Sequence, residues 1–388
     1  MTSKGVSPQR NPAFWTAFLG ALLFYEVFAM DDGAVCTNPE GLNGTCIGIR
    51  SCTPLFTVLQ TKPLSSATVE FLRKSQCGSR DRSPLVCCPP DARPPEATVE
   101  EDVSTHPNLG LLRRDICGPN QMIQNFLGWG VHLMDLPWMA LLAYTVQSGS
   151  PFKCGGTLIS ERYILTAAHC VTGLQSETKL VSVRLGEHNL TSSIDCENDF
   201  APEETFCAPP PQDVPVEKVI PHPGYVGVRD IQNDIALIRL SRPINFTDES
   251  VQPICLPIGQ EQQTQDLIGK RVTVSGWGAT MQLPPSPVIQ RWRVPVEPLS
   301  LCNETLRGVV SLSEASQLCV REVRNEGNHC SGDAGSPLIY EEEKTPFRFV
   351  QHGILSNNPP RNCGSSSIPK VYTRVGHFMK WILDTMEP

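Results

Sequence analysis

The sequence predicts an all-β fold with one C-terminal helix, preceded by a small unit that disulfide bonds hold together. Three observations lead to this prediction. Short apolar runs separated by Gly, Pro and Asn follow one another after Cys117, apolar residues recur at helical spacing only near the C-terminus, and six of the sixteen cysteines crowd into residues 36–88. A chain of 388 residues is long enough for one substantial core and a smaller second unit.

The N-terminus predicts a secreted protein. Lys4 and Arg10 precede an apolar run over residues 14–25, and Val27-Phe28-Ala29 follows, a pattern typical of a secretion signal. A membrane anchor is the alternative, but a spanning helix needs about 20 apolar residues, and this run is shorter and is followed by acidic residues. We therefore assign residues 1–29 to a signal peptide and expect an extracellular protein with no membrane partner.

Composition and cysteine usage narrow the class of protein further. The net charge of −8 leaves no basic stripe, so we expect no nucleic-acid partner. Sixteen cysteines in a secreted chain indicate disulfide bonds, and because no C-x-x-C pair occurs we expect no metal site built on thiolates. Four N-x-[ST] sequons agree with an extracellular glycoprotein. Their asparagines are Asn43, Asn189, Asn245 and Asn303.

Three segments follow the signal. Residues 36–88 are too few and too polar to be stabilised by an apolar core alone, so disulfide bonds must stabilise this unit. Residues 89–116 begin with a proline-rich acidic stretch that has few apolar side chains to bury, which predicts a linker. Residues 117–388 form the large domain, whose apolar runs predict strands and whose residues 375–386 predict an amphipathic helix. The runs are 139–144, 180–185, 235–240 and 272–274.

Two motifs in the large domain carry residues suited to nucleophilic catalysis. His169 precedes a cysteine in the block LTAAHC, and Asp234 lies among apolar strand residues in NDIAL, as suits a carboxylate that orients an imidazole. Taken alone, such a histidine is more often structural and such an aspartate caps a turn. A third block, CSGDAGSP at residues 330–337, follows these two motifs, and the order of the three blocks is what makes a catalytic interpretation specific.

With these blocks in this order, and with SGWG at 275–278 and VYTR at 371–374, the large domain resembles the chymotrypsin and trypsin family of serine proteases. The six cysteines of residues 36–88, which end in an adjacent pair, resemble an arthropod clip domain. The whole chain is thus similar to a clip-domain serine protease homologue. The resemblance implies a trypsin-like double antiparallel β-barrel with a C-terminal helix, preceded by a small disulfide-knotted clip domain.

The resemblance places His169 at the position of the general base, Asp234 at the position that orients it and Ala334 at the position of the nucleophile. A methyl group has neither a lone pair nor a proton to offer, so no acyl-enzyme can form. Loss of the serine from an intact triad costs about 10⁶ in turnover in subtilisin. We therefore expect a chain that is not an enzyme.

An artificial serine-to-alanine change would give the same Ala334, but the resemblance indicates further departures. Asn328 stands where trypsin-like relatives place an aspartate, so a cationic substrate side chain would lose its counter-charge. Asn358 and Lys370 fall where the family uses glycines, and a lysine there would fill the specificity pocket. Ser336 also replaces a family glycine, which one engineered change does not explain.

Activation in the family requires a cut whose new amine pairs with the aspartate at the position of Asp333. No Lys or Arg lies between Cys117 and Trp138, so a trypsin-like activator has nothing to cut there. We expect the oxyanion loop around Gly332 to stay zymogen-like. The nearest basic site, Arg113-Arg114, precedes Cys117, and a cut there would free the clip domain; an uncut exposed pair is the equal alternative.

The resemblance gives every cysteine a partner and leaves one cofactor open. The acidic loop between Cys196 and Cys207 has carboxylates suited to calcium, at Glu197, Asp199, Glu203 and Glu204, although a solvated loop is the favoured interpretation. We expect no other cofactor. The implied pairs are Cys36–Cys87, Cys46–Cys77, Cys52–Cys88, Cys117–Cys255, Cys154–Cys170, Cys196–Cys207, Cys302–Cys319 and Cys330–Cys363.

The leading functional hypothesis is a non-enzymatic cofactor or regulator of an extracellular protease cascade in haemolymph, in innate immunity and melanisation. Its partners would be other clip-domain proteases or targets of the prophenoloxidase type. Two alternatives remain: a trypsin-like endopeptidase, active or artificially inactivated, and a protein that recognises microbial surfaces.

Overall fold

Two units make up the chain in this computed structural model, and the division between them falls at residues 94–95. The structure describes residues 33–39, 41–52, 55–56, 59, 66–80, 83–89, 102–119, 131–198, 205–227, 231–280, 283–307, 310, 312–321, 334–341, 348–357 and 369–388. Among these residues, no helix has the length and apolar content that a membrane crossing requires.

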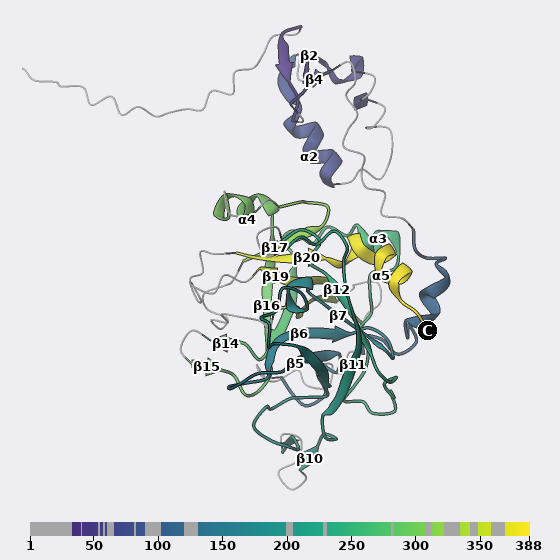
Figure 1. The fold of residues 1–388 in the computed structure, drawn as a ribbon. Helices are drawn as coiled ribbons and strands as arrows, with labels where there is room; N and C mark the ends of the chain where they lie inside the picture. Colours follow the sequence, from purple (N-terminus) through teal and green to yellow (C-terminus); the bar gives the residue numbers. More distant parts are fainter. Residues whose placement is uncertain are drawn as a thin grey trace, which may run out of the picture. The chain divides into compact units, whose positions relative to one another are not determined.

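Among the residues that the structure describes, the smaller unit contains a four-stranded antiparallel sheet and helix α2 (Figure 1). Its strands lie in the order β1-β2-β4-β3, and its few buried side chains include Leu55, Phe71 and Val86. Because so small a core stabilises a fold weakly, three disulfide bonds supply the remaining stability of this unit. The bonds are Cys36–Cys87, Cys46–Cys77 and Cys52–Cys88. The elements are β1 (Val35–Thr37), β2 (Asn43–Gly48), a 3₁₀ turn (Ile49–Ser51), α2 (Ser66–Lys74), β3 (Gln76–Arg80) and β4 (Ser83–Cys88).

The larger unit contains two closed antiparallel barrels. The first has the strand order β11-β12-β7-β6-β5-β8, and the second has the order β13-β16-β17-β20-β19-β18. The first barrel comprises β5 (Met139–Tyr144), β6 (Phe152–Leu158), β7 (Tyr163–Thr166), β8 (Leu180–Leu185), β11 (Gln212–Pro221) and β12 (Ala236–Leu240). The second comprises β13 (Arg271–Gly276), β16 (Gln290–Glu297), β17 (Gln317–Val320), β18 (Pro337–Glu341), β19 (Phe349–Asn357) and β20 (Lys370–Arg374).

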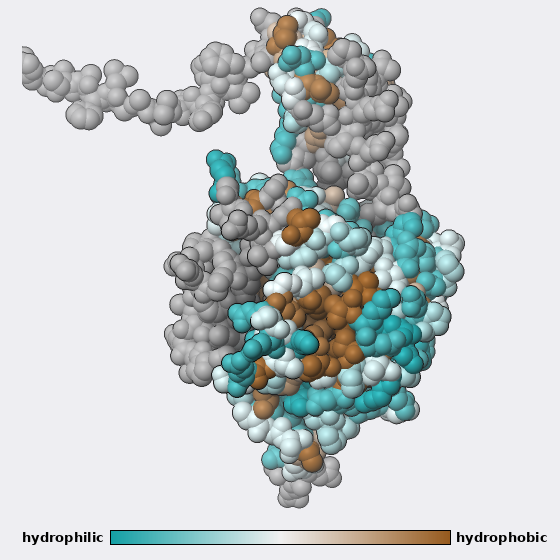
Figure 2. Space-filling view, in the orientation of Figure 1, coloured by the Kyte–Doolittle hydropathy of each residue, from teal (hydrophilic) through white to brown (hydrophobic). Residues whose placement is uncertain are grey.

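Apolar side chains fill both barrels. Leu142, Leu165 and Val183 are fully buried in the first, and Val294, Leu338 and Leu355 are buried in the second. Closure of each sheet leaves no edge strand unpaired, so the backbone hydrogen bonds are satisfied around the ring. Figure 2 shows that apolar residues also gather in one patch on the depicted face of the larger unit, over the strands of the first barrel. The predicted double-barrel fold is confirmed.

Part of the predicted linker is folded onto the larger unit. A 3₁₀ helix runs from Pro107 to Leu111, and Val103, Leu109 and Leu112 are buried in the main core. The prediction of a linker over all of residues 89–116 is therefore wrong for its described part, residues 102–116. The average composition of the stretch is polar, but three well-spaced apolar side chains are enough to anchor it.

The C-terminal helix lies where its spacing predicts. A 3₁₀ turn over Val375–Phe378 leads into α5 (Met379–Thr385), and Met379, Ile382 and Leu383 are buried. The structure also has short elements that the local sequence patterns did not predict. They are β9 (Cys196–Glu197), β10 (Phe206–Cys207), α3 (Gln260–Gln263), β14 (Ala279–Thr280), β15 (Leu283–Pro285) and α4 (Leu299–Thr305).

Candidate active site

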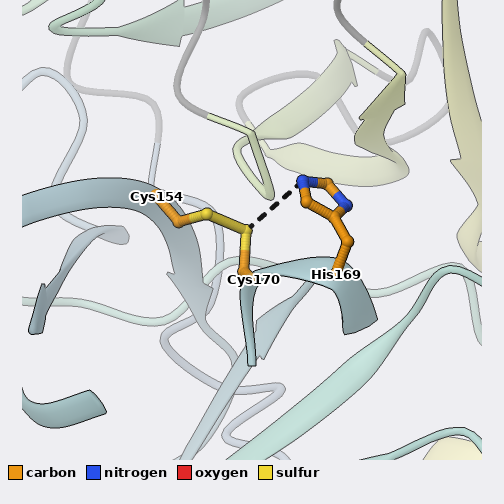
Figure 3. A group of neighbouring side chains, drawn as sticks. All are labelled: Cys154, His169 and Cys170. Atoms are coloured by element: carbon orange, nitrogen blue, oxygen red, sulfur yellow. Dashed lines mark hydrogen bonds between the residues drawn. A yellow bond between two sulfur atoms is a disulfide. The ribbon is translucent and has the colours of Figure 1, made fainter. Parts of the chain in front are cut away.

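His169 lies on a short 3₁₀ turn, Ala168–Cys170, directly after strand β7. The neighbouring Cys170 is bonded to Cys154 of β6, so a disulfide fixes the backbone that carries the imidazole (Figure 3). The His169 Nε2 atom lies 3.7 Å from the sulfur of Cys170. Because both sulfurs belong to the disulfide, this group offers no thiolate to a metal ion, although its three side chains lie within 4.8 Å of one another.

Asp234 holds this imidazole in a fixed orientation. One carboxylate oxygen of Asp234 lies 2.8 Å from His169 Nδ1, and the other accepts the backbone N–H of His169 at 2.9 Å. The carboxylate is buried, with an exposed side-chain fraction of 1%, whereas the histidine side chain is 21% exposed. An ionised carboxylate only accepts hydrogen bonds, so Nδ1 carries the proton and Nε2 is left with a free lone pair.

The second barrel supplies further partners for Asp234. The hydroxyl of Ser356 on β19 donates to its carboxylate at 2.6 Å, and the hydroxyl of Thr373 on β20 donates to its main-chain carbonyl at 2.8 Å. Tyr225 lies close by, and burial together with the charge of Asp234 raises the pKa of its phenol. Sequence reasoning missed Ser356 and Thr373, because nothing in the local sequence marks them as partners of this aspartate.

Ala334 lies at the seam between the barrels, against Cys170, the residue that follows His169. Its carbonyl accepts the N–H of Gly155 on β6 at 2.8 Å and lies 3.4 Å from the sulfur of Cys170. The next residue, Gly335, has φ +87° and donates its N–H to Leu355 of β19 at 2.8 Å. The structure therefore brings His169 and Asp234 together and places Ala334 against the cysteine next to His169.

Neighbouring atoms pack closely around the turn at Ala334 and Gly335. A Cβ atom on Gly335 would lie 2.3 Å from the Thr166 hydroxyl oxygen and 2.5 Å from the Gly155 carbonyl oxygen. Ser336 is 2% exposed, and its hydroxyl has no hydrogen-bond partner among the described residues. The loop that carries Ala334 is therefore fixed between the two barrels by backbone bonds and close packing.

Most residues predicted for the specificity pocket and the oxyanion loop lie outside the described residues. These are Asn328, Asn358, Gly332 and Asp333, and the same holds for the pair Cys330–Cys363. Lys370 is described: it lies on β20 opposite Val320 of β17 and is 5% exposed. The seven other predicted disulfides are present, including Cys117–Cys255, Cys196–Cys207 and Cys302–Cys319.

The acidic loop predicted as a possible calcium site is described at Glu197 alone. Its carboxylate accepts the N–H of Leu133 at 3.2 Å and lies 3.4 Å from His132 Nδ1 and 3.8 Å from His188 Nε2. Glu197 is thus bonded to groups within the protein. Asp199, Glu203 and Glu204 lie outside the described residues.

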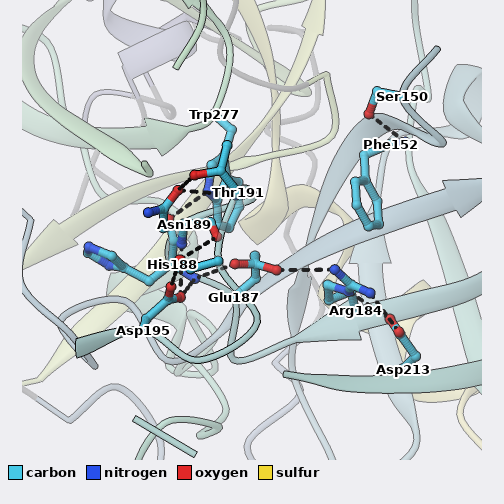
Figure 4. Close-up of polar contacts among 11 residues, drawn as sticks. Ser150, Phe152, Arg184, Glu187, His188, Asn189, Thr191, Asp195, Asp213 and Trp277 are labelled. Atoms are coloured by element: carbon cyan, nitrogen blue, oxygen red, sulfur yellow. Dashed lines mark hydrogen bonds and ion pairs between the residues drawn. The ribbon is translucent and has the colours of Figure 1, made fainter. Parts of the chain in front are cut away.

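A buried polar cluster next to this loop was not foreseen (Figure 4). Asp195 accepts the N–H groups of His188 and Asn189 at 3.2 and 2.9 Å, and Glu187 accepts a bond from Arg184 at 3.2 Å. Burial, and then the charge of Asp195, raises the pKa of Glu187, and burial lowers the pKa of His188. These bonds fix the loop after β8.

The four sequons lie at positions of differing exposure. Asn43, Asn245 and Asn303 are exposed, and Asn189 is half-buried at the edge of the polar cluster, where its side-chain oxygen accepts the Thr191 N–H at 3.1 Å. An attached glycan is compatible with the three exposed asparagines. Glycosylation at all four remains a prediction.

Comparison with known proteins agrees with this architecture. Residues 132–382 match the family described as Trypsin, and residues 36–88 match the regulatory CLIP domain of proteinases. The chain is 38% identical to CLIP domain-containing serine protease HP8 of Bombyx mori, over 91% of this chain and 95% of that protein. It is 36% identical to phenoloxidase-activating factor 3 of Holotrichia diomphalia, over 89% and 92% of the two chains.

A solved structure shows the same likeness. The crystal structure of the Drosophila Grass clip serine protease of the Toll pathway matches with a TM-score of 0.58 and 35% sequence identity, and the match covers 92% of this chain and 98% of that one. Both domains match known families, and the relatives align over nearly their full length, so the family of this chain can be assigned. The chain belongs to the arthropod clip-domain serine protease family.

Proposed function

We propose that this chain is a catalytically inactive, secreted member of its family that acts as a cofactor or regulator in an extracellular protease cascade leading to phenoloxidase activation. The observation that carries the proposal is Ala334, a residue without a hydroxyl, at the barrel seam against Cys170, the neighbour of His169. The imidazole is oriented and has a free Nε2, but Ala334 has no hydroxyl from which to remove a proton.

Two further features of the sequence support loss of catalysis. The segment between Cys117 and Trp138 has no basic residue at which a trypsin-like activator would cut. Asn328 offers no negative charge to a cationic substrate side chain, and Ser336 occupies a glycine position of the family. Together these departures favour a natural change of function over a single engineered substitution.

The names of relatives support the choice of cascade. One of the relatives is a phenoloxidase-activating factor and another is a phenoloxidase-activating enzyme of Spodoptera litura. The predicted signal peptide and sixteen cysteines support an extracellular location in haemolymph. Figure 2 shows apolar residues gathered on one face of the larger unit, the kind of surface at which proteins associate, which supports action by binding.

A labelling experiment tests the loss of catalysis. The natural chain, the Ala334→Ser variant and an Ala334→Ser/His169→Ala double variant are treated with a fluorophosphonate probe and assayed with arginine and small-residue esters. We expect no adduct and no turnover with the natural chain, and no robust turnover with Ala334→Ser. A covalent adduct on the natural chain would overturn the proposal, and strong turnover by Ala334→Ser that the double variant lacks would indicate a disabled protease.

A reconstitution tests the regulatory role. The purified chain is added to a clip-domain protease and prophenoloxidase, and phenoloxidase activity is measured against its concentration. We expect a saturable change in activity. No change at any concentration, together with retention of the chain on bacteria or glucan in a pull-down, would favour recognition of microbial surfaces instead.

A further inference from the structure

A pocket of about 290 Å³ lies in the larger unit around the Cys117–Cys255 disulfide. It shares no residue with the His169–Asp234–Ala334 site. Aliphatic side chains form its apolar part, and three arginines, Arg113, Arg114 and Arg348, also line it. None of the described residues that line the pocket is acidic. The aliphatic residues are Leu112, Ile159, Ile254, Leu256, Ile258 and Val350.

The three arginines differ in how far the protein neutralises their charge. Arg113 is paired with Asp115 at 2.9 Å and with Glu161 at 3.1 Å, so its charge is compensated. Arg348 donates to the main-chain carbonyls of Arg114 at 2.6 Å and Asp115 at 3.0 Å. Carbonyl oxygens satisfy its donors but carry no net charge, so the positive charge of Arg348 persists beside the pocket.

Arg114 is exposed, and its guanidinium makes no hydrogen bond or ion pair with the residues that the structure describes. Its backbone, by contrast, is fixed: the N–H of Arg114 donates to Leu112 at 2.9 Å, and its carbonyl accepts from Arg348. A fixed backbone with an unneutralised guanidinium at a pocket wall presents a five-donor fork to an incoming anion, and such a fork suits a carboxylate.

The same turn argues against the dibasic pair as a processing site. Cys117 and Ile116 both donate their N–H groups to the carbonyl of Arg113, at 2.9 and 3.2 Å, which closes a tight turn across Arg114. Arg348 occupies the carbonyl of the peptide bond that would be cut. Processing favours exposed loop tips whose backbone is free, and this backbone is bonded to the barrel unit.

We propose that this pocket binds an acidic peptide segment of a partner protein. An aliphatic side chain of the segment packs against the apolar part of the pocket near Leu256 and Ile258, and its carboxylates pair with Arg114 and Arg348. Charge complementarity selects this occupant, because uncompensated arginines beside aliphatic side chains match carboxylates that flank an apolar residue. The inference goes beyond the proposed function and holds whether or not the chain cleaves peptides.

Fluorescence anisotropy with three labelled, end-blocked peptides tests the pocket. The probes are Glu-Glu-Leu-Glu-Glu, Gln-Gln-Leu-Gln-Gln and Glu-Glu-Gly-Glu-Glu, titrated with the full chain at low and high salt. We expect saturable binding of the first peptide alone, weakened by salt. Arg114→Gln should weaken it about tenfold, the equivalent of about 1.4 kcal/mol, and Ile258→Ser should weaken it as well.

Arg307→Gln is the matched control, because Arg307 is another exposed arginine of the same unit, and this variant should bind the first peptide as the natural chain does. Both arginine variants change exposed side chains, and equal melting temperatures would show that they fold alike. The proposal is overturned if the first peptide shows no saturable binding, if the Gln peptide binds equally well, or if Arg307→Gln weakens binding as much as Arg114→Gln. Binding of a free fatty carboxylate but not of the peptide would also overturn it, since the site would then take a small molecule.

Trypsin digestion tests the turn independently. The native chain should resist cutting after Arg114 until it is unfolded, whereas Arg348→Gln should be cut there faster because the carbonyl of Arg114 is released. Rapid cutting of the natural chain at Arg114 would show that the turn is open and that Arg114 is not held in place.

Discussion

Single residues at the barrel seam determine the geometry of the candidate site. Gly335 adopts a left-handed conformation because its N–H must reach Leu355 while the carbonyl of Ala334 reaches Gly155. Only glycine fits there, since a side chain would collide with Thr166. The carbonyl of Ala334 is bonded to Gly155, and its side chain packs against the core of the larger unit.

Gly335→Ala should destabilise the larger unit strongly. The left-handed backbone costs about 1–2 kcal/mol for a residue with a Cβ, and contacts of 2.3 and 2.5 Å add steric repulsion. We expect a loss of at least about 3 kcal/mol in the free energy of unfolding. Gly173→Ala is the control: Gly173 has φ +61°, but a Cβ atom added there would have no neighbour within 4 Å, so only the backbone cost applies. Equal melting temperatures of the two variants would contradict the packing argument.

His352 makes the free energy of unfolding depend on pH. It is buried on β19, and burial, with the charge of Arg374, lowers its pKa to about 3. Between this value and the unfolded value near 6.5, the unfolded chain binds the extra proton. Stability is therefore complete above about pH 6.5 and falls by about 1.4 kcal/mol for each pH unit below it, as far as about pH 3.

Denaturant unfolding at a series of pH values checks this expectation. The natural chain should lose stability between about pH 6.5 and pH 4.5 with this additional slope, and His352→Gln should lack that part of the slope because it has no group to protonate. If both proteins lose stability in parallel, His352 is not the group responsible.

At the scale of elements, local patterns predicted strands well and long-range partners poorly. The strands at Met139–Tyr144 and Leu180–Leu185 begin and end as predicted, because apolar runs and turn residues are local signals. Ser356 and Thr373 bond to Asp234 across 122 and 139 residues of sequence, and only barrel closure brings them there. The 3₁₀ helix Pro107–Leu111 was missed because its burial depends on a docking partner, α5.

Asn108 links these two elements and gives a test of their docking. Its side-chain amide donates to the carbonyls of Leu383 at 2.8 Å and Met386 at 3.0 Å, at the C-terminal end of α5. Asn108→Ala should cost about 1–3 kcal/mol, because it leaves two carbonyls without a donor. Asn108→Asp should cost more, since it places a negative charge against helix carbonyls.

Thermal unfolding and hydrogen exchange of α5 provide the measurement for both variants. The melting temperature should fall from the natural chain to Asn108→Ala and again to Asn108→Asp. The exchange rates of the amides in the last turn of α5 should rise in the same order. An Asp variant as stable as the natural chain would show that the amide does not donate to these carbonyls.

At the scale of the whole molecule, the two units depend on different forces. The barrels bury two large apolar clusters, whereas the clip unit has a few apolar side chains and three disulfides. The all-β fold, the C-terminal helix and seven cysteine pairs were correctly anticipated, the pairs by resemblance. Barrel strand order was not readable from local sequence, because it depends on which distant strands meet.

Mild reduction should therefore unfold the two units separately. Removing native disulfides from a small domain costs about 2–5 kcal/mol, and the clip unit has few buried apolar side chains to offset this loss, whereas the barrels retain their large apolar clusters. We expect amides of strands β2, β3 and β4 to lose protection at reductant concentrations at which strands β5 and β12 remain protected. Simultaneous loss in both units would contradict this division.

Asp234 has a consequence for how such a molecule changes during evolution. Because the residue that orients the imidazole is also bonded to Ser356 and Thr373, it joins the two halves of the larger unit. Replacing Asp234 would remove the bond of its carboxylate to Ser356 as well as its bond to His169, and would loosen this joint whether or not the chain cleaves peptides. Remnants of a catalytic apparatus can thus persist for mechanical reasons, and an intact histidine–aspartate pair is no measure of whether a chain of this fold still cuts peptides.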